Sequence, residues 1–125
     1  MAKLFLLLGA SFGGLAVAIG AFGAHALKSV LETTNRLETF ETAVKYQFYH
    51  ALALLFLGLL MTKFDHRMFT WSGYGFIAGI ILFSGSLYIL SLSGITKWGA
   101  VTPLGGVALL IGWITLIIGI AKSVN

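Results

Sequence analysis

Four separate stretches of the sequence are apolar for about the length that an α-helix needs to cross a hydrocarbon core of about 30 Å. They run approximately over residues 4–24, 46–61, 69–90 and 101–121. Backbone amide and carbonyl groups find no water inside a bilayer, so a chain that crosses it forms helices or a closed barrel. The stretches are continuously apolar without strict alternation, which excludes a barrel. The sequence therefore predicts an all-α, polytopic membrane protein with four transmembrane helices.

Composition supports this interpretation. With 58% apolar and 10% charged residues, the 125-residue chain has far more apolar surface than a soluble domain of its size needs to bury. The first apolar run is longer than the core of a secretory signal peptide, so we expect it to be a true span. One extramembrane segment of real length remains, over about residues 27–45. We expect a single domain over residues 1–125, folded as a compact four-helix bundle.

The charges point to membrane lipids as partners. The net charge is +4, but the eight Lys and Arg residues are scattered over the helix ends and do not cluster on one face, so nucleic acid is not a predicted partner. Cations at the ends of spans attract anionic headgroups. The chain has no cysteine, which excludes thiolate metal sites and iron–sulfur clusters.

Four spans place both chain termini on the same side of the membrane. Lys and Arg divide equally, with Lys3, Lys63, Arg67 and Lys122 on the terminal side and Lys28, Arg36, Lys45 and Lys97 on the other. Acidic residues contribute little to orientation, so the glutamates of the long connection do not break the tie. We favour cytoplasmic termini.

The connection between the first two spans is patterned for helix. Ser29 with Glu32, and Asn35 with Glu38, each have the spacing of a capping box, so two helix starts are predicted. From residue 36 to beyond residue 61 nothing interrupts the helical pattern, which predicts one helix of roughly 26 residues whose outer part lies on the membrane surface. In the last span, Thr102 is the expected cap and Pro103 occupies the first turn.

Small residues recur at helical spacing in three of the four spans. In lipid such residues let helices approach closely, which supplies much of the packing energy. Two interpretations stay open: the small-residue seams hold one chain together, or at least one of them faces a second copy in a homo-oligomer. The glycines expected to mediate helix packing are Gly9, Gly13, Gly20, Gly23, Gly75, Gly79, Gly105, Gly106, Gly112 and Gly119.

Few polar groups lie within the spans, and such groups are candidates for function. His25 falls in the last turn of the first span, while Gln47 and His50 fall at the entrance of the second span, on the same side of the membrane. We expect His25 and His50 to meet at similar depth. Three roles compete for them: simple hydrogen bonding near the headgroups, proton relay or pH sensing, and ligation of a haem or metal ion.

A second polar cluster lies in the third span, where Ser84, Ser86 and Tyr88 occur close together. Serine hydroxyls in a span commonly bond the carbonyl one turn earlier. Tyr88 and Trp98 are expected as interfacial anchors, and Trp113 as an aromatic contact within the last span. His66, in the loop between spans two and three, is expected to be simply solvated.

No enzyme signature is present. The sequence has no phosphate-binding loop, no intramembrane carboxylate, no nucleophile with a paired base and no H-E-x-x-H motif. We therefore predict a protein that is not an enzyme, with no cofactor and no metal site.

Several segments together resemble a known family. These are Gly20-Ala21-Phe22-Gly23-Ala24-His25-Ala26-Leu27, Tyr46-Gln47, His50-Ala51-Leu52-Ala53-Leu54-Leu55, Leu82-Phe83-Ser84-Gly85-Ser86-Leu87-Tyr88, Thr102-Pro103-Leu104-Gly105-Gly106 and Gly112-Trp113. In that order they resemble the small bacterial membrane proteins of unknown function typified by YwdK and YgdD, which have small eukaryotic relatives. The resemblance covers essentially the whole chain. It implies a four-span protein of the bacterial plasma membrane and lends no established activity.

The family motif falls on residues that define a candidate functional cluster, which contains His25, Gln47, His50, Ser86, Tyr88 and Pro103. We expect these residues near the membrane face opposite the termini. The leading hypothesis is an oligomeric membrane protein that uses this cluster to bind lipid, a small ligand or a membrane partner. The alternative is a minimal transporter or channel in which the histidines assist proton or ion movement.

Overall fold

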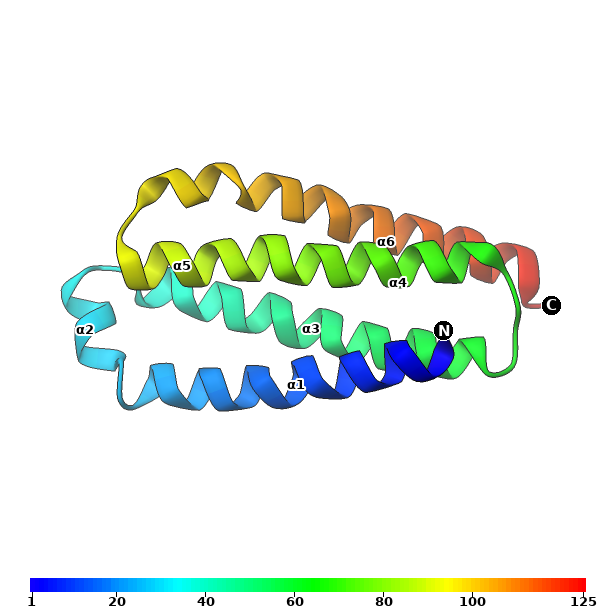
Figure 1. Ribbon diagram of the computed structural model, residues 1–125, viewed down its shortest axis with the longest axis horizontal. Coiled ribbons are helices and arrows are strands. Elements are labelled where there is room, and N and C mark those ends of the chain that lie inside the picture. The colour runs from blue at the N-terminus through cyan, green and yellow to red at the C-terminus, as the bar shows by residue number, and fades with distance from the viewer.

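The structure is a computed structural model that describes residues 1–125, and it consists of helices joined by short connections (Figure 1). Four helices are long and apolar enough to cross a membrane, which confirms the prediction of a polytopic all-α fold. They comprise α1 (Ala2–Ala24), α3 (Leu37–Met61), the combined helix Arg67–Ser93, and the segment Thr96–Ser123 that contains α6 (Thr102–Ser123).

The four long helices lie side by side in the order α1, α3, the combined helix, and α6 (Figure 1). The combined helix consists of α4 (Arg67–Gly79), a π-turn η1 (Ile80–Ser84) and α5 (Gly85–Ser93). The main packing partners are α1 with α3 and α4 with α6, and α3 also packs on η1 and α5. Both termini lie at the same end of the molecule, as an even number of spans requires (Figure 1).

The second span begins earlier than its apolar run. The predicted span over residues 46–61 is part of a longer helix, Leu37–Met61, in agreement with the uninterrupted helical pattern from residue 36. The first turns of α3 pack on the end of α1, where Phe40 lies against Gly23 and Val44 against Gly20. The polar start of α3 therefore lies level with the last turns of α1.

Both predicted capping boxes in the connection are wrong, although helices do begin near the expected positions. Neither α2 (Lys28–Thr33) nor α3 has a side-chain hydrogen bond at its N-cap, and the N-cap residues are Leu27 and Arg36. The backbone turns at Asn35, whose φ of 59° is left-handed. The Arg36 amide bonds the Leu31 carbonyl and the Asn35 amide bonds the Glu32 carbonyl, which is the Schellman pattern of a helix C-terminus. Asparagine tolerates this backbone conformation better than most residues do, so Asn35 ends α2 and does not cap α3.

The start of α6 also differs from the prediction. Pro103 lies in the first turn, as expected, but Val101 is the N-cap and Thr102 does not cap the helix. The Thr102 hydroxyl instead contacts the Ser86 hydroxyl at 2.7 Å, joining α6 to α5. The 3₁₀ turn η2 (Thr96–Ala100) precedes this junction and carries Lys97.

Glycines form the closest helix contacts within the chain. An added Cβ at Gly9 would lie 2.9 Å from the Ala51 carbonyl oxygen, across the α1–α3 seam. At Gly75 it would lie 2.8 Å from the Gly112 amide nitrogen, across the α4–α6 seam. A Cβ at Gly105 would overlap the backbone of Phe83. All three small-residue seams are therefore occupied by neighbours from the same chain.

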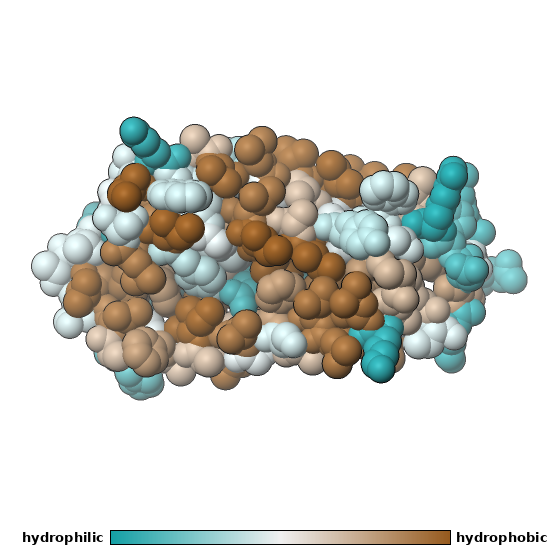
Figure 2. All heavy atoms as spheres, in the orientation of Figure 1, coloured by the Kyte–Doolittle hydropathy of each residue, from teal (hydrophilic) through white to brown (hydrophobic).

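The outer surface suits a lipid environment. Figure 2 shows apolar side chains over the middle of one face, with most strongly hydrophilic groups towards the two ends of the molecule. Large apolar side chains such as Leu15, Phe56 and Ile117 are more than half exposed. Exposed apolar side chains around the middle of the molecule indicate a surface that contacts the hydrocarbon chains of lipids.

Candidate functional site

His50 forms the centre of the most distinctive polar contact in the molecule. Its Nδ1 lies 2.7 Å from the Tyr46 carbonyl oxygen, one turn earlier on α3, and its Nε2 lies 3.0 Å from the Trp113 indole nitrogen on α6. A carbonyl can only accept and an indole N–H can only donate. Both contacts are hydrogen bonds when Nδ1 carries the proton and Nε2 accepts, which describes one tautomer of a neutral imidazole.

The depth of His50 differs from the prediction. We placed it at the entrance of the second span, but residues 37–49 precede it within α3 and residues 51–61 follow it, so it lies close to the middle of the helix. The reason is that α3 extends beyond its apolar run. Trp113 likewise lies at the middle of α6, over Thr102–Ser123. A hydrogen bond at this depth joins two polar groups that would otherwise face hydrocarbon.

The His50–Trp113 pair lies in a groove between α3 and α6, which we call the α3–α6 groove. Its volume is about 500 Å³ and its exposed lining is mostly apolar. It is lined by Tyr46, His50, Phe83, Pro103, Gly106, Val107, Leu109, Leu110 and Trp113. Along α6 it extends over the ten steps from Pro103 to Trp113, or about 15 Å at the α-helical rise. This length is half of a hydrocarbon core of about 30 Å, or one leaflet.

Two features keep the α3–α6 groove open and define its wall. Gly106 faces it without a close neighbour, since the only atom within 4 Å of an added Cβ there is Phe83 Cδ2 at 3.9 Å. The π-turn η1 supplies Phe83, whose ring packs on Tyr46 with a centroid separation of 4.5 Å. The next residue, Ser84, is buried and donates to the Ala43 carbonyl of α3 at 2.7 Å. The π-turn therefore fastens the third span to α3 at the level of the groove.

Gln47 belongs to a separate polar contact on α3. Its Nε2 donates to the Phe12 carbonyl of α1 at 2.9 Å, and its Oε1 accepts from the Tyr88 hydroxyl of α5 at 2.6 Å. Tyr88 was expected as an interfacial anchor, but its hydroxyl points inward to this buried amide. The Gln47 amide thus joins three spans without contributing to the α3–α6 groove.

The remaining predicted residues are divided between the groove and other places. Pro103 lines the α3–α6 groove near its end, and Ser86 lies beside it through the hydrogen bond to Thr102. His25 is the exposed C-cap of α1 and has no side-chain hydrogen bond.

The expected meeting of His25 and His50 is not found. Because Gly13 faces Ala51 across the α1–α3 seam, His25 lies twelve residues beyond the level of His50 along the chain, or roughly 18 Å. The cause is the earlier start of α3, which places His50 deeper than its apolar run indicated.

His66, expected to be solvated, has a structural role. It is the N-cap of α4, and its Nδ1 accepts a hydrogen bond from the Met68 amide at 3.1 Å. This contact satisfies one of the free amides at the start of the helix.

Sequence reasoning missed Trp113, Tyr46 and Phe83 as members of the site. A signal was available for the first of them. A tryptophan and a histidine at the centres of two spans each need a hydrogen-bond partner, and an indole donor matches an imidazole acceptor. The π-turn that positions Phe83 has no comparable sequence signal.

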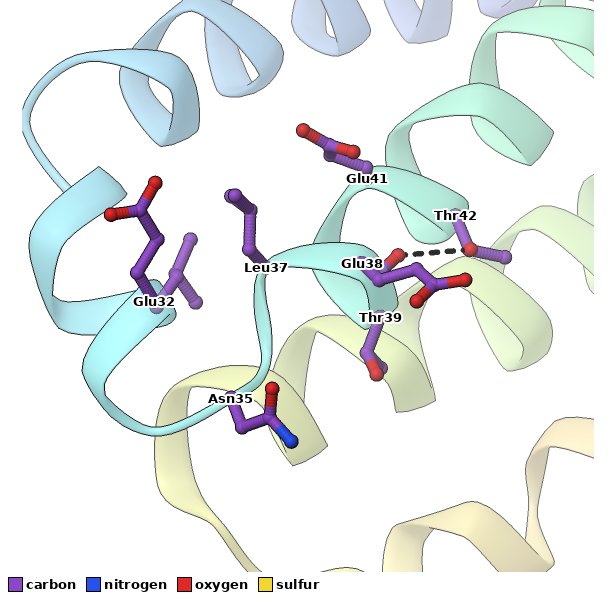
Figure 3. A pocket seen from close by; sticks show the side chains of 8 residues that line it. Glu32, Asn35, Leu37, Glu38, Thr39, Glu41 and Thr42 are labelled. Atoms are coloured by element: carbon purple, nitrogen blue, oxygen red, sulfur yellow. Dashed lines mark hydrogen bonds between the residues drawn. The ribbon is translucent and has the colours of Figure 1, made fainter.

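A larger and more polar hollow lies at the loop end, between α2 and α3. Its volume is about 710 Å³, and it is lined by Glu32, Glu38 and Glu41 together with Asn35 and Thr42. Figure 3 shows the three carboxylates pointing in different directions. No group of three potential metal ligands occurs in the structure. This open acidic hollow does not have the convergent ligands of a cation site.

The exposed lining of the α3–α6 groove is mostly apolar, with a single histidine–tryptophan pair in it. Its walls come from aromatic and aliphatic side chains, and both ring nitrogens of His50 and the Trp113 indole N–H are hydrogen-bonded within the protein. Such a surface offers dispersion contacts and few hydrogen bonds.

Comparison with known proteins agrees with this membrane architecture. A protein-family model described as "Protein of unknown function (DUF423)" matches residues 19–106. A UPF0382 membrane protein of Staphylococcus aureus is 48% identical over 120 residues, covering 96% of this chain and 97% of the relative. The UPF0382 membrane protein YwdK of Bacillus subtilis is 46% identical over 121 residues, covering 96% and 98%.

The UPF0382 inner membrane protein YgdD of Escherichia coli is 40% identical over 120 residues, covering 95% of this chain and 91% of the relative. No solved structure matches the chain. Near-complete coverage of several relatives at these identities and the family match together show that the chain belongs to the UPF0382 (DUF423) family of multi-pass membrane proteins.

Proposed function

We propose that this protein is a lipid-binding membrane protein that holds one acyl chain of a bilayer lipid in the α3–α6 groove. The observation that carries the proposal is the dimension of the groove. It is open along two membrane-spanning helices, is lined mostly by apolar side chains, and extends about 15 Å from Pro103 to Trp113. An acyl chain that enters from one leaflet fills such a groove without exposing a polar group.

The state of His50 supports an apolar occupant. Both ring nitrogens are engaged, with Tyr46 and Trp113, so the imidazole offers no free donor or acceptor to a polar ligand. The histidine-assisted transporter receives less support, because the two hydrogen-bond partners of His50 are a carbonyl and an indole, and neither exchanges a proton with the imidazole near neutral pH. The lipid-binding hypothesis therefore fits the site better than the transporter alternative.

The relatives support a location for this activity. YgdD of Escherichia coli is named an inner membrane protein. We propose the bacterial plasma membrane for this chain as well, with cytoplasmic termini. The proposed role needs no reaction chemistry and no cofactor, since the groove acts through shape and apolar contact.

Fluorescence quenching by brominated lipid tests the proposal. Trp113 is 41% exposed and lies on the groove, so a variant with Trp71→Phe and Trp98→Phe reports on the groove alone. The protein is reconstituted in vesicles that contain increasing fractions of a phospholipid brominated at mid-chain. A binding site predicts two quenching phases, the first at a mole fraction too low for random lipid contact.

Gly106 and Gly14 provide a matched pair of variants. Gly106→Leu places a side chain in the α3–α6 groove, whereas Gly14→Leu adds the same volume on the outer surface of α1, where an added Cβ has no neighbour within 4 Å. We expect Gly106→Leu to abolish the first quenching phase and Gly14→Leu to leave both phases. Quenching in a single phase, equal in all three proteins, would overturn the proposal.

A further inference from the structure

A second apolar groove lies on the opposite side of α3, between α1 and α3. We call it the α1–α3 groove; residues that line it include Val17, Gly20, Ala21, Val44, Lys45 and Tyr49. Its volume is about 290 Å³, and a smaller hollow of about 180 Å³ continues it towards the loop end and shares Gly20, Val44 and Lys45. The exposed lining of the larger part is almost entirely apolar.

Two charged residues lie at the end of this groove nearest the loops. Lys45 lines both parts, and Glu41, one turn earlier on α3, lines the smaller part. Both side chains are exposed, and neither has an ion-pair partner: the one ion pair within 4.0 Å in the structure joins Lys28 and Glu32. The Lys45 ammonium and the Glu41 carboxylate thus lie one helical turn apart without forming an ion pair.

The order of groups along α3 matches the order of groups in a phospholipid. From the middle of the helix towards the loop end, the sequence is Tyr49, Lys45 and Glu41. In a zwitterionic phospholipid the acyl chain, the phosphate and the headgroup ammonium follow one another in the same direction. The lysine ammonium also reaches towards the interface along its own aliphatic stem, which keeps the stem in apolar contact.

We infer that the α1–α3 groove binds a phospholipid with an ethanolamine headgroup. The Lys45 ammonium binds the phosphate, the Glu41 carboxylate accepts hydrogen bonds from the headgroup ammonium, and one acyl chain lies along Val17 and Val44. Residues four apart on a helix have Cβ atoms about 5–6 Å apart, which suits a phosphate and an ammonium joined by two carbons. This inference is independent of the α3–α6 groove.

The carboxylate determines which headgroup is preferred. A primary ammonium has three N–H donors for a carboxylate, while the quaternary ammonium of choline has none. An anionic glycerol headgroup brings no cation to Glu41 and is repelled by it. Ethanolamine lipid is therefore preferred over both the choline and the glycerol lipid of the same acyl chains.

Native mass spectrometry of the full-length protein tests the inference with equimolar phosphatidylethanolamine, phosphatidylcholine and phosphatidylglycerol of identical acyl chains. We expect an ethanolamine-lipid preference of about 1.4- to 5-fold, since exposed charge pairs contribute about 0.2–1 kcal/mol. Glu41→Gln is expected to remove this preference, and Lys45→Gln to weaken binding of all three lipids. Both residues are exposed, so the fold tolerates the changes.

Glu38→Gln is the matched control, because Glu38 carries the same charge on the same helix but lines the acidic hollow and not the groove. It should retain the ethanolamine-lipid preference. Equal binding of the ethanolamine and choline lipids by the unmodified protein, or a preference that survives Glu41→Gln, would overturn the inference. Gly106→Leu distinguishes the two proposals. It should remove the first quenching phase of Trp113 in the α3–α6 groove and leave the headgroup preference of the α1–α3 groove unchanged.

Discussion

His50 illustrates how a polar residue is accommodated at mid-membrane. An unpaired imidazole surrounded by hydrocarbon is costly, and the structure removes that cost by giving each ring nitrogen one partner. One partner is local, the Tyr46 carbonyl on the same helix, and the other is the Trp113 indole from a helix 63 residues away in sequence. The pair therefore also sets the register of α3 against α6.

Trp113→Phe is predicted to destabilise the protein by about 1 kcal/mol, because it leaves His50 Nε2 without a donor while keeping most of the aromatic contact. Measured by reversible unfolding in mixed detergent micelles, Trp113→Phe and His50→Leu should not be additive, with a coupling of about 0.5–1.5 kcal/mol. Trp71→Phe is the control, since the Trp71 side chain is 58% exposed and makes no hydrogen bond. Strict additivity would show that the contact contributes nothing.

The residues of the site were only partly predictable. His50 and Gln47 stand out in the sequence because polar groups within a span are expensive. Their partners do not, because the contacts to Trp113 and Tyr88 depend on how helices far apart in sequence are aligned. The error at His25 has the same origin: its distance from His50 follows from the start of α3, which an apolar run does not define.

The glycine seams act at the scale of whole helices, and their positions predict opposite effects of the same substitution. At Gly75 an added methyl group would press on the backbone of Gly112 and Ala108, so Gly75→Ala should cost about 1–3 kcal/mol by forcing α4 and α6 apart. At Gly14 the methyl group meets no neighbour, so Gly14→Ala should stabilise α1 by up to about 1 kcal/mol. The free energy of unfolding, measured in the same mixed detergent micelles, should fall for Gly75→Ala and rise for Gly14→Ala. Equal effects at the two positions would contradict this assignment of faces.

The π-turn is the irregular element of the third span, and its removal should uncouple that span from α3. Deleting Ile81, an exposed residue within the turn, would return the helix to α-periodicity and rotate Phe83 and Ser84 by about 100° against the preceding turns. We expect a loss of about 1–3 kcal/mol, because the Ser84 bond to Ala43 and the packing of Phe83 on Tyr46 are lost together. An unchanged midpoint of thermal unfolding would mean that the π-turn has no role in packing.

The four spans themselves follow directly from the sequence, since unpaired backbone groups are too costly in lipid for the chain to do anything else. The helix ends were less predictable. Asn35 was expected to cap α3 but ends α2, because a short polar side chain suits both a cap and a left-handed backbone. Which small-residue seam meets which neighbour was not predictable, because Gly23, Gly79 and Gly112 all lie in similar repeats.

In the molecule as a whole, the small-residue seams give no evidence for self-association, because helices of the same chain pack against them. The homo-oligomer stays a prediction, and an interface would lie on surfaces that the fold leaves open. The outer face of α1 is one such surface, since few of its side chains are buried. Lipid acyl chains would cover that face of α1 as well as a second copy of the chain would.

The arrangement of the chain across the membrane gives the last prediction. The sequence has no cysteine, so single substitutions at Ser123, Asp65, Asn35 and Thr96 provide unique sites for a membrane-impermeant maleimide. Ser123 ends α6 and Asp65 lies in the connection from α3 to α4, at the end of the molecule with the termini. Asn35 lies in the connection from α2 to α3 and Thr96 in the connection from α5 to α6, and both connections are at the other end (Figure 1). We expect each pair to be labelled from one side, with the Ser123 pair reacting only after intact cells are permeabilised, as cytoplasmic termini require. Labelling of Ser123→Cys and Asn35→Cys from the same side would contradict four crossings, whereas exchange of the two pairs would reverse the orientation and leave the fold unchanged.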